Sequence, residues 1–424
     1  MNIEQLYSTF QKASGVNTDT RSVAQGELFF ALKGPSFNGN LFAAKALEAG
    51  AIAVVIDEEV ELPAGATSFL VDDVLSTLQE LARHHRNQLN GTVIGLTGSN
   101  GKTTAKELFK SVLSQKYDTM ATVGNLNNHI GVPLTLLRTP VDTEFVIVEM
   151  GANHQGEIKL LSSISQPDMG YITNFGKAHL EGFGGIEGVI KGKSELYDYL
   201  RANAKQALVN HNDERQMQKS EGIDRVTYGT SSSNFPMTFT ETNYPATVIY
   251  EGQSFESQLT GSFHTVNIGA AIALGLHFGV SPEDIKAGIN GYKPSNNRSE
   301  WRKTESNRIM LDAYNANPSS MSASIQSFME EAEAPKVLIL GDMFELGKDA
   351  LREHQTIVDQ CAEFDAKVII VGENFAQTKA PESFLVFRTT SSCLDHLQKN
   401  SINQSTVLLK GSRGMQLESL LAVL

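Results

Sequence analysis

Short apolar runs alternate with amphipathic stretches along the chain. Four runs are rich in β-branched residues and favour buried parallel strands over helices: Ala51–Ile56, Phe145–Val148, Val337–Leu340 and Val368–Val371. The stretch Lys102–Tyr117 instead places apolar residues at helical spacing, on one face: Ala105, Leu108, Phe109, Val112 and Leu113. Strands that alternate with such helices predict an α/β fold with mostly parallel sheets and right-handed crossovers.

The pattern divides the chain into three expected units: residues 1–88, 89–297 and 298–424. The second begins with a strand at Thr92–Thr97, and its Ser/Thr/Asn-rich stretch Tyr228–Thr247 predicts turns and short antiparallel strands. The segment KPSNNR, Lys293–Arg298, is an expected hinge. Four strands are expected in the third unit: Arg308–Asp312, Lys336–Gly341, Lys367–Gly372 and Thr406–Lys410.

Composition narrows the class of protein. The chain has 424 residues, 41% hydrophobic and 20% charged, as in soluble globular proteins, which argues against disorder. Its net charge of −13 disfavours general nucleic-acid binding but allows a local basic pocket for a small phosphate ligand. The two cysteines, Cys361 and Cys393, are too few for a disulfide scaffold, and no spaced His/Cys cluster indicates structural zinc.

The start of the chain and its apolar runs indicate a cytoplasmic protein. The sequence MNIEQLYSTF lacks the basic start and apolar core of a secretory signal. None of the apolar runs approaches the roughly 18 residues of a membrane-spanning helix. We therefore expect a soluble chain without a membrane span.

A nucleotide-binding loop is the strongest local signal. The sequence VIGLTGSNGKTT, Val93–Thr104, joins an apolar strand, a glycine-rich turn and the amphipathic helix. Gly98 and Gly101 allow backbone N–H groups to converge on a phosphate, and the start of the helix adds the positive end of its dipole. Lys102 can bridge the outer phosphates, and the hydroxyl of Thr103 can bind Mg²⁺.

Three further residues follow in motifs near expected strand ends. FVIVEMG places Glu149 at the end of a strand, where a parallel sheet forms its ligand crevice and Mg²⁺ finds a hard oxygen ligand. ITNFGKAHLEGFGG carries His179 in a glycine-rich loop, and KGKSELYDYL carries Lys193 on a helix. Taken alone, Glu149 could equally be a turn-pairing carboxylate, whereas such a histidine is usually a surface or packing residue and such a lysine is usually solvated.

The third unit offers polar loops at three expected strand ends. In LDAYNANPSSM, Asp312 ends a strand, Tyr314, Asn315 and Asn317 follow in a loop, and a helix is expected to start near Pro318–Ser319. Such groups suit a nucleotide base, a ribose or a substrate amine, although each loop could also be simple turn chemistry. The other two loops, LGDMFELG and LLKGSRG, offer Asp342, Glu345, Lys410 and Arg413.

Together these motifs resemble the Mur ligases, ATP-dependent amide-forming enzymes of peptidoglycan assembly. GSNGKTT, the EMG strand end and NFGKAHLEGFGG match the ATP site of that family in order. DAYNANPSSM, LGDMFELG and LLKGSRGMQLE resemble the branch that joins D-alanyl-D-alanine to UDP-N-acetylmuramoyl-tripeptide. TDTRSVAQGELFFALKG, GPSFNGNLF and GNLNNHIGVPLTLL match the same branch, so the resemblance covers essentially the whole chain.

The resemblance implies three α/β domains: a small UDP-sugar domain, a central P-loop ATPase domain and a C-terminal Rossmann-like domain that closes over ATP. It implies ATP and Mg²⁺ as cofactors, an acyl-phosphate intermediate and a monomer. The implied catalytic residues are Lys102, His179 and Lys193. The implied ATP site consists of Gly98, Ser99, Asn100, Gly101, Lys102, Thr103, Thr104, Asn267, Arg298, Asp312 and Asn315.

The remaining implied sites are for metal and for the two other substrates. The implied metal ligands are Thr103, Glu149, His179 and a carbamylated Lys193. The implied UDP-substrate residues are Thr20, Arg21, Asn38, Asn40, Asn127 and Asn128, and the implied amine-side residues are Tyr314 and Asn317. The chain departs from the family where Asn38 and Asn40 replace the acid and histidine of F-D-G-H. It departs again where Phe263 and His264 precede Asn267, which puts one adenine-side contact in doubt.

Two other functions stay open on the sequence. One is a sister enzyme: another amino-acid-adding Mur ligase or a folylpolyglutamate synthetase, which shares the P-loop variant. The other is a nucleotide-dependent switch. Apart from these two functions, the glycine-rich loop could also be an ordinary turn. The strict G-x-x-x-x-G-K-[ST] pattern fails, because Leu96 stands where it requires glycine and Gly95 comes one residue too early. The sequence also leaves open whether the third residue of the peptide substrate is lysine or diaminopimelate.

Overall fold

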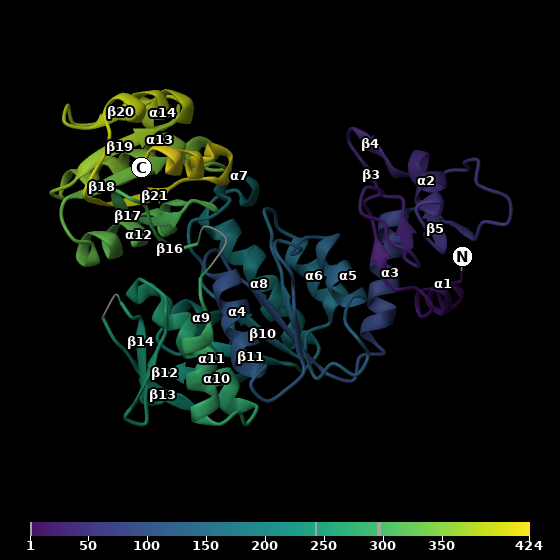
Figure 1. Cartoon of the computed structure of the whole chain (residues 1–424). Coiled ribbons are helices and arrows are strands. Elements are labelled where there is room, and N and C mark those ends of the chain that lie inside the picture. Colours follow the sequence, from purple (N-terminus) through teal and green to yellow (C-terminus); the bar gives the residue numbers. More distant parts are fainter. Residues whose placement is uncertain (1, 242–243, 295–297) are drawn as a thin grey trace.

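The computed structural model describes residues 2–241, 244–294 and 298–424. Its main elements form three units, each with a largely parallel sheet. The N-terminal unit (purple in Figure 1) and the C-terminal unit (green to yellow) lie on different flanks of the central unit. The fold class is therefore α/β with mostly parallel sheets, as the sequence predicts.

The N-terminal unit contains a four-stranded parallel sheet in the order β1-β2-β5-β6 and a two-stranded hairpin, β3-β4. Helix α3 packs against β2 and also against α5 and α6 of the central unit. Its elements are α1 (Ile3–Phe10), β1 (Val16–Asn17), β2 (Leu28–Phe30), β3 (Lys33–Gly34), β4 (Phe37–Asn38), α2 (Ala43–Glu48), β5 (Ala53–Ile56), β6 (Ser68–Leu70) and α3 (Val74–Arg86).

The first part of the central unit is the βα region around the glycine-rich loop. Strand β7 lies between β9 and β10, all three parallel, so the order of connections reverses beside β7. Ligands of open α/β sheets bind at such a reversal, at the carboxyl ends of the strands. The elements are β7 (Thr92–Thr97), α4 (Lys102–Leu113), β8 (Thr119–Ala121), α5 (Gly131–Leu137), β9 (Phe145–Glu149), α6 (Glu157–Ser165), β10 (Met169–Ile172), α7 (Leu180–Phe183) and α8 (Ile186–Ala202).

The second part of the central unit extends the same sheet to nine strands, in the order β15-β14-β13-β12-β11-β10-β7-β9-β8. The pairing is parallel from β8 to β13 and antiparallel from β13 to β15. The elements are β11 (Gln206–Asn210), α9 (Glu214–Lys219), β12 (Asp224–Gly229), β13 (Phe235–Phe239), β14 (Thr247–Tyr250), β15 (Gln253–Glu256), α10 (Thr265–His277) and α11 (Pro282–Gly291).

Alternate residues of the central strands enter two separate cores. Val146 and Val148 of β9 join the core under α5, α6 and α8, whereas Phe145 and Ile147 join the core under α4, α10 and α11. This alternation explains why the strands read as continuous apolar runs, since both faces of the sheet are covered. The helices on both faces hold the carboxyl ends of β7, β9 and β10 at one rigid edge.

The C-terminal unit has a six-stranded sheet in the order β16-β17-β21-β18-β19-β20, with only the β16–β17 pair antiparallel. The carboxyl ends of β17, β21 and β18 are neighbours, so their loops meet. The elements are β16 (Glu300–Lys303), β17 (Asn307–Asp312), α12 (Pro318–Glu331), β18 (Lys336–Gly341), α13 (Ala350–Ala362), β19 (Lys367–Val371), β20 (Leu385–Phe387), α14 (Thr390–Lys399) and β21 (Ser405–Lys410).

Most predicted elements occur where the pattern placed them. The strand at Thr92–Thr97 is confirmed, and α4 starts at Lys102 but ends at Leu113 rather than Tyr117, because the chain turns after Ser114. The stretch Tyr228–Thr247 is only partly antiparallel, since β13 runs parallel to β12 before β14 reverses. Residues 295–297 of the expected hinge lie outside the described residues.

Among the described residues, no helix is both long enough and apolar enough to cross a membrane.

Candidate active site

The glycine-rich loop connects β7 to α4 at the edge where the order of strands reverses. Gly98 has φ +144° and Gly101 has φ +78°, conformations that residues with a side chain rarely adopt. A Cβ at Gly98 would lie 1.9 Å from Oγ1 of Thr173, so the loop also requires glycine for space. Within the described residues, no side chain caps α4, whose first N–H groups therefore face the site. The loop has the form of a phosphate-binding loop.

Lys102 begins α4 and folds back over this loop. Its ammonium group donates to the carbonyl oxygens of Gly98, at 2.7 Å, and of Ser99, at 3.3 Å. Burial lowers the pKa of Lys102; the Glu149 carboxylate opposes this shift and the Arg298 cation adds to it. The lysine is thus held where bound phosphates would lie.

Thr103 and Glu149 meet in the site as the sequence predicts. The Thr103 hydroxyl donates to Oε2 of Glu149 at 3.0 Å, and Nδ2 of Asn127 donates to Oε1 at 2.8 Å. Glu149 is almost fully buried at the end of β9. The described residues contain no cluster of three or more His, Cys, Asp or Glu side chains that could hold a metal ion. A nucleotide-bound Mg²⁺ needs only one or two carboxylates besides phosphate and water, so this donor set fits it.

His179 and Lys193 occupy different surroundings. His179 has φ +53° and its Nδ1 contacts a carboxylate oxygen of Glu345 in the C-terminal unit. The hydrogen bond with His179 lowers the pKa of Glu345. Lys193 is fully buried on α8, behind the cavity wall, and donates to the carbonyl oxygen of Ala152 at 3.1 Å. Burial holds the pKa of Lys193 well below its usual value, and the Lys102 cation lowers it further.

The C-terminal unit contributes a second wall. Asp312, at the end of β17, contacts the ammonium group of Lys410 and accepts a hydrogen bond from Ser324 at 3.2 Å. Burial alone would raise the pKa of Asp312, but the pairing with Lys410 brings it below its usual value. The guanidinium of Arg298 stacks 3.7 Å from the ring centroid of Tyr314.

A cavity of about 770 Å³ lies between these two walls. Several predicted residues line it with the loop: Glu149, His179, Asn267, Arg298, Asp312, Tyr314, Asn315 and Asn317. Asn267 lies against the loop, since a Cβ at Gly101 would be 2.7 Å from its Nδ2. His264 is one helical turn before Asn267, and burial lowers its pKa to about 4. At neutral pH the imidazole is therefore uncharged.

The predicted UDP-side residues fall into two groups. Asn127 and Asn128 line the central cavity, and Oδ1 of Asn128 accepts a hydrogen bond from the N–H of Gly131, the first residue of α5, at 2.9 Å. Thr20 and Arg21 lie in the N-terminal unit and do not line that cavity. Arg21 is exposed and pairs with Asp19 at 2.6 Å.

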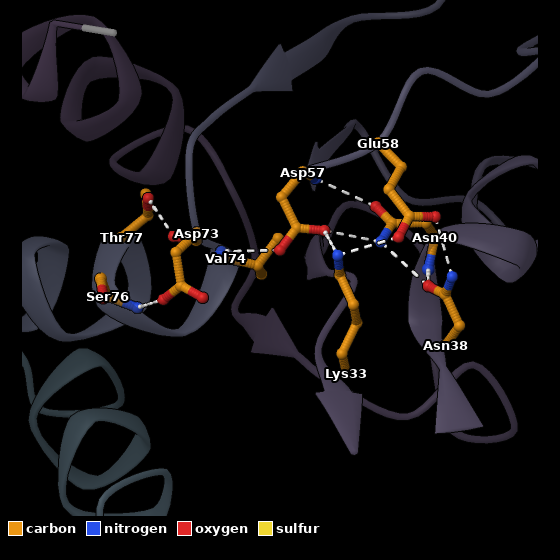
Figure 2. A network of polar contacts seen from close by, with 9 residues as sticks. All are labelled: Lys33, Asn38, Asn40, Asp57, Glu58, Asp73, Val74, Ser76 and Thr77. Carbon is orange, nitrogen blue, oxygen red and sulfur yellow. Dashed lines mark hydrogen bonds and ion pairs between the residues drawn. The ribbon is translucent and has the colours of Figure 1, made fainter. Parts of the chain in front are cut away.

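Asn38 and Asn40 belong to a polar network around the β3–β4 hairpin (Figure 2). Asn40 is 1% exposed, donates to Oδ1 of Asp57 at 2.7 Å and accepts from the Asp57 N–H at 3.0 Å. Asn38 donates to Glu58 at 2.8 Å, and Lys33 pairs with both acids, at 3.0 and 2.9 Å. The side-chain amide of Asn40 is thus hydrogen-bonded to Asp57 through both its oxygen and its nitrogen. Asn38, in contrast to the buried Asn40, is only partly buried.

Sequence reasoning missed several residues of the cavity. Asn174 lies two residues after the end of β10 and accepts a hydrogen bond from the N–H of Asn100 at 3.1 Å. Its position after a strand could have indicated a site residue. Asp213 and Arg215, which follow β11 in the sequence, also line the cavity. At these positions the sequence suggests only the cap of a helix. The cavity can hold a phosphorylated ligand between the loop that carries Lys102, the buried Glu149 carboxylate and the Arg298–Tyr314 wall.

Three family models match successive parts of the chain. Residues 12–86 match the Mur ligase family catalytic domain, residues 96–275 the Mur ligase middle domain, and residues 297–413 the Mur ligase glutamate ligase domain. These ranges together cover most of the chain.

Individual relatives are similar over nearly their whole length. The UDP-N-acetylmuramoyl-tripeptide–D-alanyl-D-alanine ligase of Bacillus subtilis is 36% identical over 96% of this chain and 92% of that protein. A crystal structure of MurF from Acinetobacter baumannii superposes with a TM-score of 0.86 at 30% identity, covering 99% of this chain and 98% of that one. The MurF ligase of Thermotoga maritima in complex with ADP gives a TM-score of 0.85 at 25% identity, covering 98% and 97%.

Proposed function

This chain belongs to the Mur ligase family, and we propose that it joins D-alanyl-D-alanine to UDP-N-acetylmuramoyl-tripeptide at the expense of ATP. The products are UDP-N-acetylmuramoyl-pentapeptide, ADP and phosphate. The observation that carries the proposal is the full-length similarity to ligases of that name, at 36% identity, together with the intact phosphate-binding loop. The enzyme is an ATP-dependent peptide ligase of peptidoglycan synthesis.

The side chains around the loop suit activation of a carboxylate by phosphoryl transfer. A carboxylate is a poor electrophile, so the γ-phosphoryl group of ATP converts it to an acyl phosphate, which an amine then attacks. In this proposal the ammonium group of Lys102, which folds over the loop, and the helix N-terminus neutralise the charge that develops on the transferring group. No protein nucleophile is required, and positioning dominates the rate.

We assign the metal site to Thr103, Glu149 and His179, which line the same cavity, with Lys193 joining them once carbamylated. When bound, Mg²⁺ neutralises charge on the phosphates. The Thr103 hydroxyl and the Glu149 carboxylate are 3.0 Å apart and Asn127 orients the carboxylate, so oxygen donors converge beside the loop. His179 contacts Glu345 of the C-terminal unit, so it also links the two walls of the cavity.

Lys193 is proposed to carry a carbamate in the active enzyme. The neutral amine attacks CO₂, a C–N bond forms and a proton leaves, which turns a cation into an anionic oxygen donor. The lowered pKa of Lys193 supports this, because only the neutral amine reacts. Its full burial behind Ala152 argues against an ordinary solvated lysine.

The remaining assignments follow the same family pattern. We propose three domains at 1–88, 89–297 and 298–424, with the first binding the UDP part through Thr20, Arg21 and Asn38. We assign Asn127 and Asn128, which line the cavity, to the same side, and Tyr314, which also lines it, to the amine substrate. The enzyme is proposed to work as a cytoplasmic monomer, with the C-terminal unit excluding water from the acyl phosphate.

The deciding experiment is a phosphate-release assay over UDP-linked peptides and dipeptides. Phosphate release that requires both UDP-N-acetylmuramoyl-tripeptide and D-alanyl-D-alanine supports the proposal. Lys102→Ala should abolish turnover while the protein stays folded, and Lys110→Ala, an exposed position on the same helix, should leave it unchanged. Release with single amino acids instead of the dipeptide would indicate a sister ligase.

A further inference from the structure

Asn317 uses both ends of its side-chain amide, and the two ends face different units. Its Oδ1 accepts a hydrogen bond from the backbone N–H of Ser320 at 3.0 Å, which caps α12. Because a backbone N–H can only donate, this contact fixes the orientation of the amide. The Nδ2 group therefore faces outward, where it donates to Oδ1 of Asn100 at 2.6 Å. The two asparagines are 217 positions apart in the sequence.

Asn100 is part of the phosphate-binding loop, and the central unit holds its backbone. The Asn100 N–H donates to Oδ1 of Asn174 at 3.1 Å. Its carbonyl oxygen accepts from the hydroxyl of Thr173 at 2.6 Å and from Nδ2 of Asn174 at 3.0 Å. Since both backbone groups are bound within the central unit, the side chain is the part of Asn100 that meets the C-terminal unit.

The same turn of α12 docks on the loop after β10. The Ser319 hydroxyl accepts a hydrogen bond from the backbone N–H of Lys177 at 3.0 Å. A Cβ on Gly176 would lie 3.0 Å from Nδ2 of Asn100 and 3.2 Å from Oγ of Ser319. The phosphate-binding loop, the Gly176 loop and α12 thus meet with little room for a single methyl group.

We propose that Asn317 is a positioning residue that sets the register between the phosphate-binding loop and the C-terminal unit, acting through Asn100. The inference rests on the proposed function, in which the loop holds the transferring phosphoryl group and the C-terminal unit carries the amine side. A misplacement of about 1 Å between reacting groups can cost on the order of 100-fold in rate. Asn317 therefore acts on turnover and not on nucleotide affinity.

Three variants separate this role from helix capping. Asn317→Ser keeps a good N-cap, but the shorter hydroxyl cannot reach Asn100. Ser320→Ala is the matched control, because it removes the other half of the capping box and leaves the contact between the two asparagines intact. Gly176→Ala adds a methyl group between the phosphate-binding loop and α12 from the central unit, and it leaves both asparagines unmutated.

Each variant is measured for kcat and KM by phosphate release, for its ADP dissociation constant by calorimetry, and for its radius of gyration with ADP by X-ray scattering. We expect Asn317→Ser and Gly176→Ala to lose between about 5- and 100-fold in kcat. Their ADP dissociation constants should stay within about threefold of wild type, and their radii of gyration should increase. Ser320→Ala should keep kcat within about twofold, since a cap acts on helix stability.

Three results would overturn the proposal. Equal losses of kcat in Asn317→Ser and Ser320→Ala would assign the effect to capping, and an unchanged kcat in Asn317→Ser would remove the role altogether. An ADP affinity that fell as far as kcat would make Asn317 a nucleotide contact. The radius of gyration and ADP affinity need neither of the proposed substrates, so they test the contact with Asn100 even if the substrate assignment fails.

Discussion

At the scale of single residues, Lys193 has the most unusual surroundings. It is fully buried, with Nζ on the carbonyl oxygen of Ala152 and 5.0 Å from the ring centroid of Phe183. We expect Lys193→Ala to lose at least about 100-fold in kcat, and a short carboxylic acid in the buffer to restore part of it by filling the vacated space. Lys191→Ala is the control, because Lys191 is exposed on the same helix, and it should lower kcat only slightly. A fully active Lys193→Ala enzyme would contradict the carbamate assignment.

His264 gives a pH-dependent prediction about stability. Burial lowers its folded pKa to about 4, with the Asp312 carboxylate and the Lys410 cation acting in opposite directions, whereas an unfolded histidine titrates near about 6.5. Between these values the unfolded chain binds more protons, so the free energy of unfolding falls as the pH decreases from about 6.5 to about 4. His264→Asn should remove up to about 3 kcal/mol of this fall, measured by urea unfolding at several pH values. His129→Asn, at an exposed position, should leave the pH profile unchanged.

At the scale of elements, the β3–β4 hairpin depends on the carboxylate of Asp57. That carboxylate accepts from Asn40 at 2.7 Å and from the N–H of Val74 at 3.3 Å, where α3 begins, and it pairs with Lys33 (Figure 2). Asp57→Asn removes the ion pair with Lys33. It also replaces one carboxylate oxygen by an NH₂ group, so the Asn40 amide and the Val74 N–H have fewer acceptor oxygens to share. It should cost about 1–3 kcal/mol of unfolding free energy, and Glu59→Gln, an exposed neighbour, should cost little. Because Asn38 lies on this hairpin, the KM for the UDP-tripeptide should rise more than the KM for ATP. Equal rises in both values would contradict the UDP-side assignment of the hairpin.

Elements and the phosphate-binding loop could be predicted because their signals are local. The apolar face of Lys102–Leu113 and the glycines at 98 and 101 are readable from spacing and residue type alone. The role of Asn40 could not be read this way, since its partner Asp57 is 17 positions away and the amide is chemically suited to ligand and protein alike. The contact between Asn317 and Asn100 joins residues from different units, which no local pattern reveals.

At the scale of the whole molecule, an ion pair outside the cavity joins the central unit to the C-terminal unit. Nζ of Lys177 lies 2.9 Å from both carboxylate oxygens of Glu353, whose side chain is 2% exposed on α13. We expect Lys177→Glu to place a like charge beside this buried acid, which keeps Arg352 at 3.0 Å as its remaining partner, and so to enlarge the radius of gyration and to lower kcat. Combining it with Glu353→Lys should restore part of both values. A double variant no better than the worse single one would show that the pair does not hold the units together.

Because of helix α3, the N-terminal and C-terminal units are attached to the central unit in different ways. Its buried residues Val74, Leu78 and Leu81 pack with Leu28 and Phe30 of the N-terminal sheet, and the helix also packs along α5 and α6 of the central unit. The same apolar core reaches Met321 and Phe328 of the C-terminal unit, but there the polar contacts with the central unit come from loop residues such as Asn317 and Lys177. In a calorimeter, the first two units should therefore melt as one cooperative block, while the third can give its own heat-absorption peak, whose midpoint moves with nucleotide concentration.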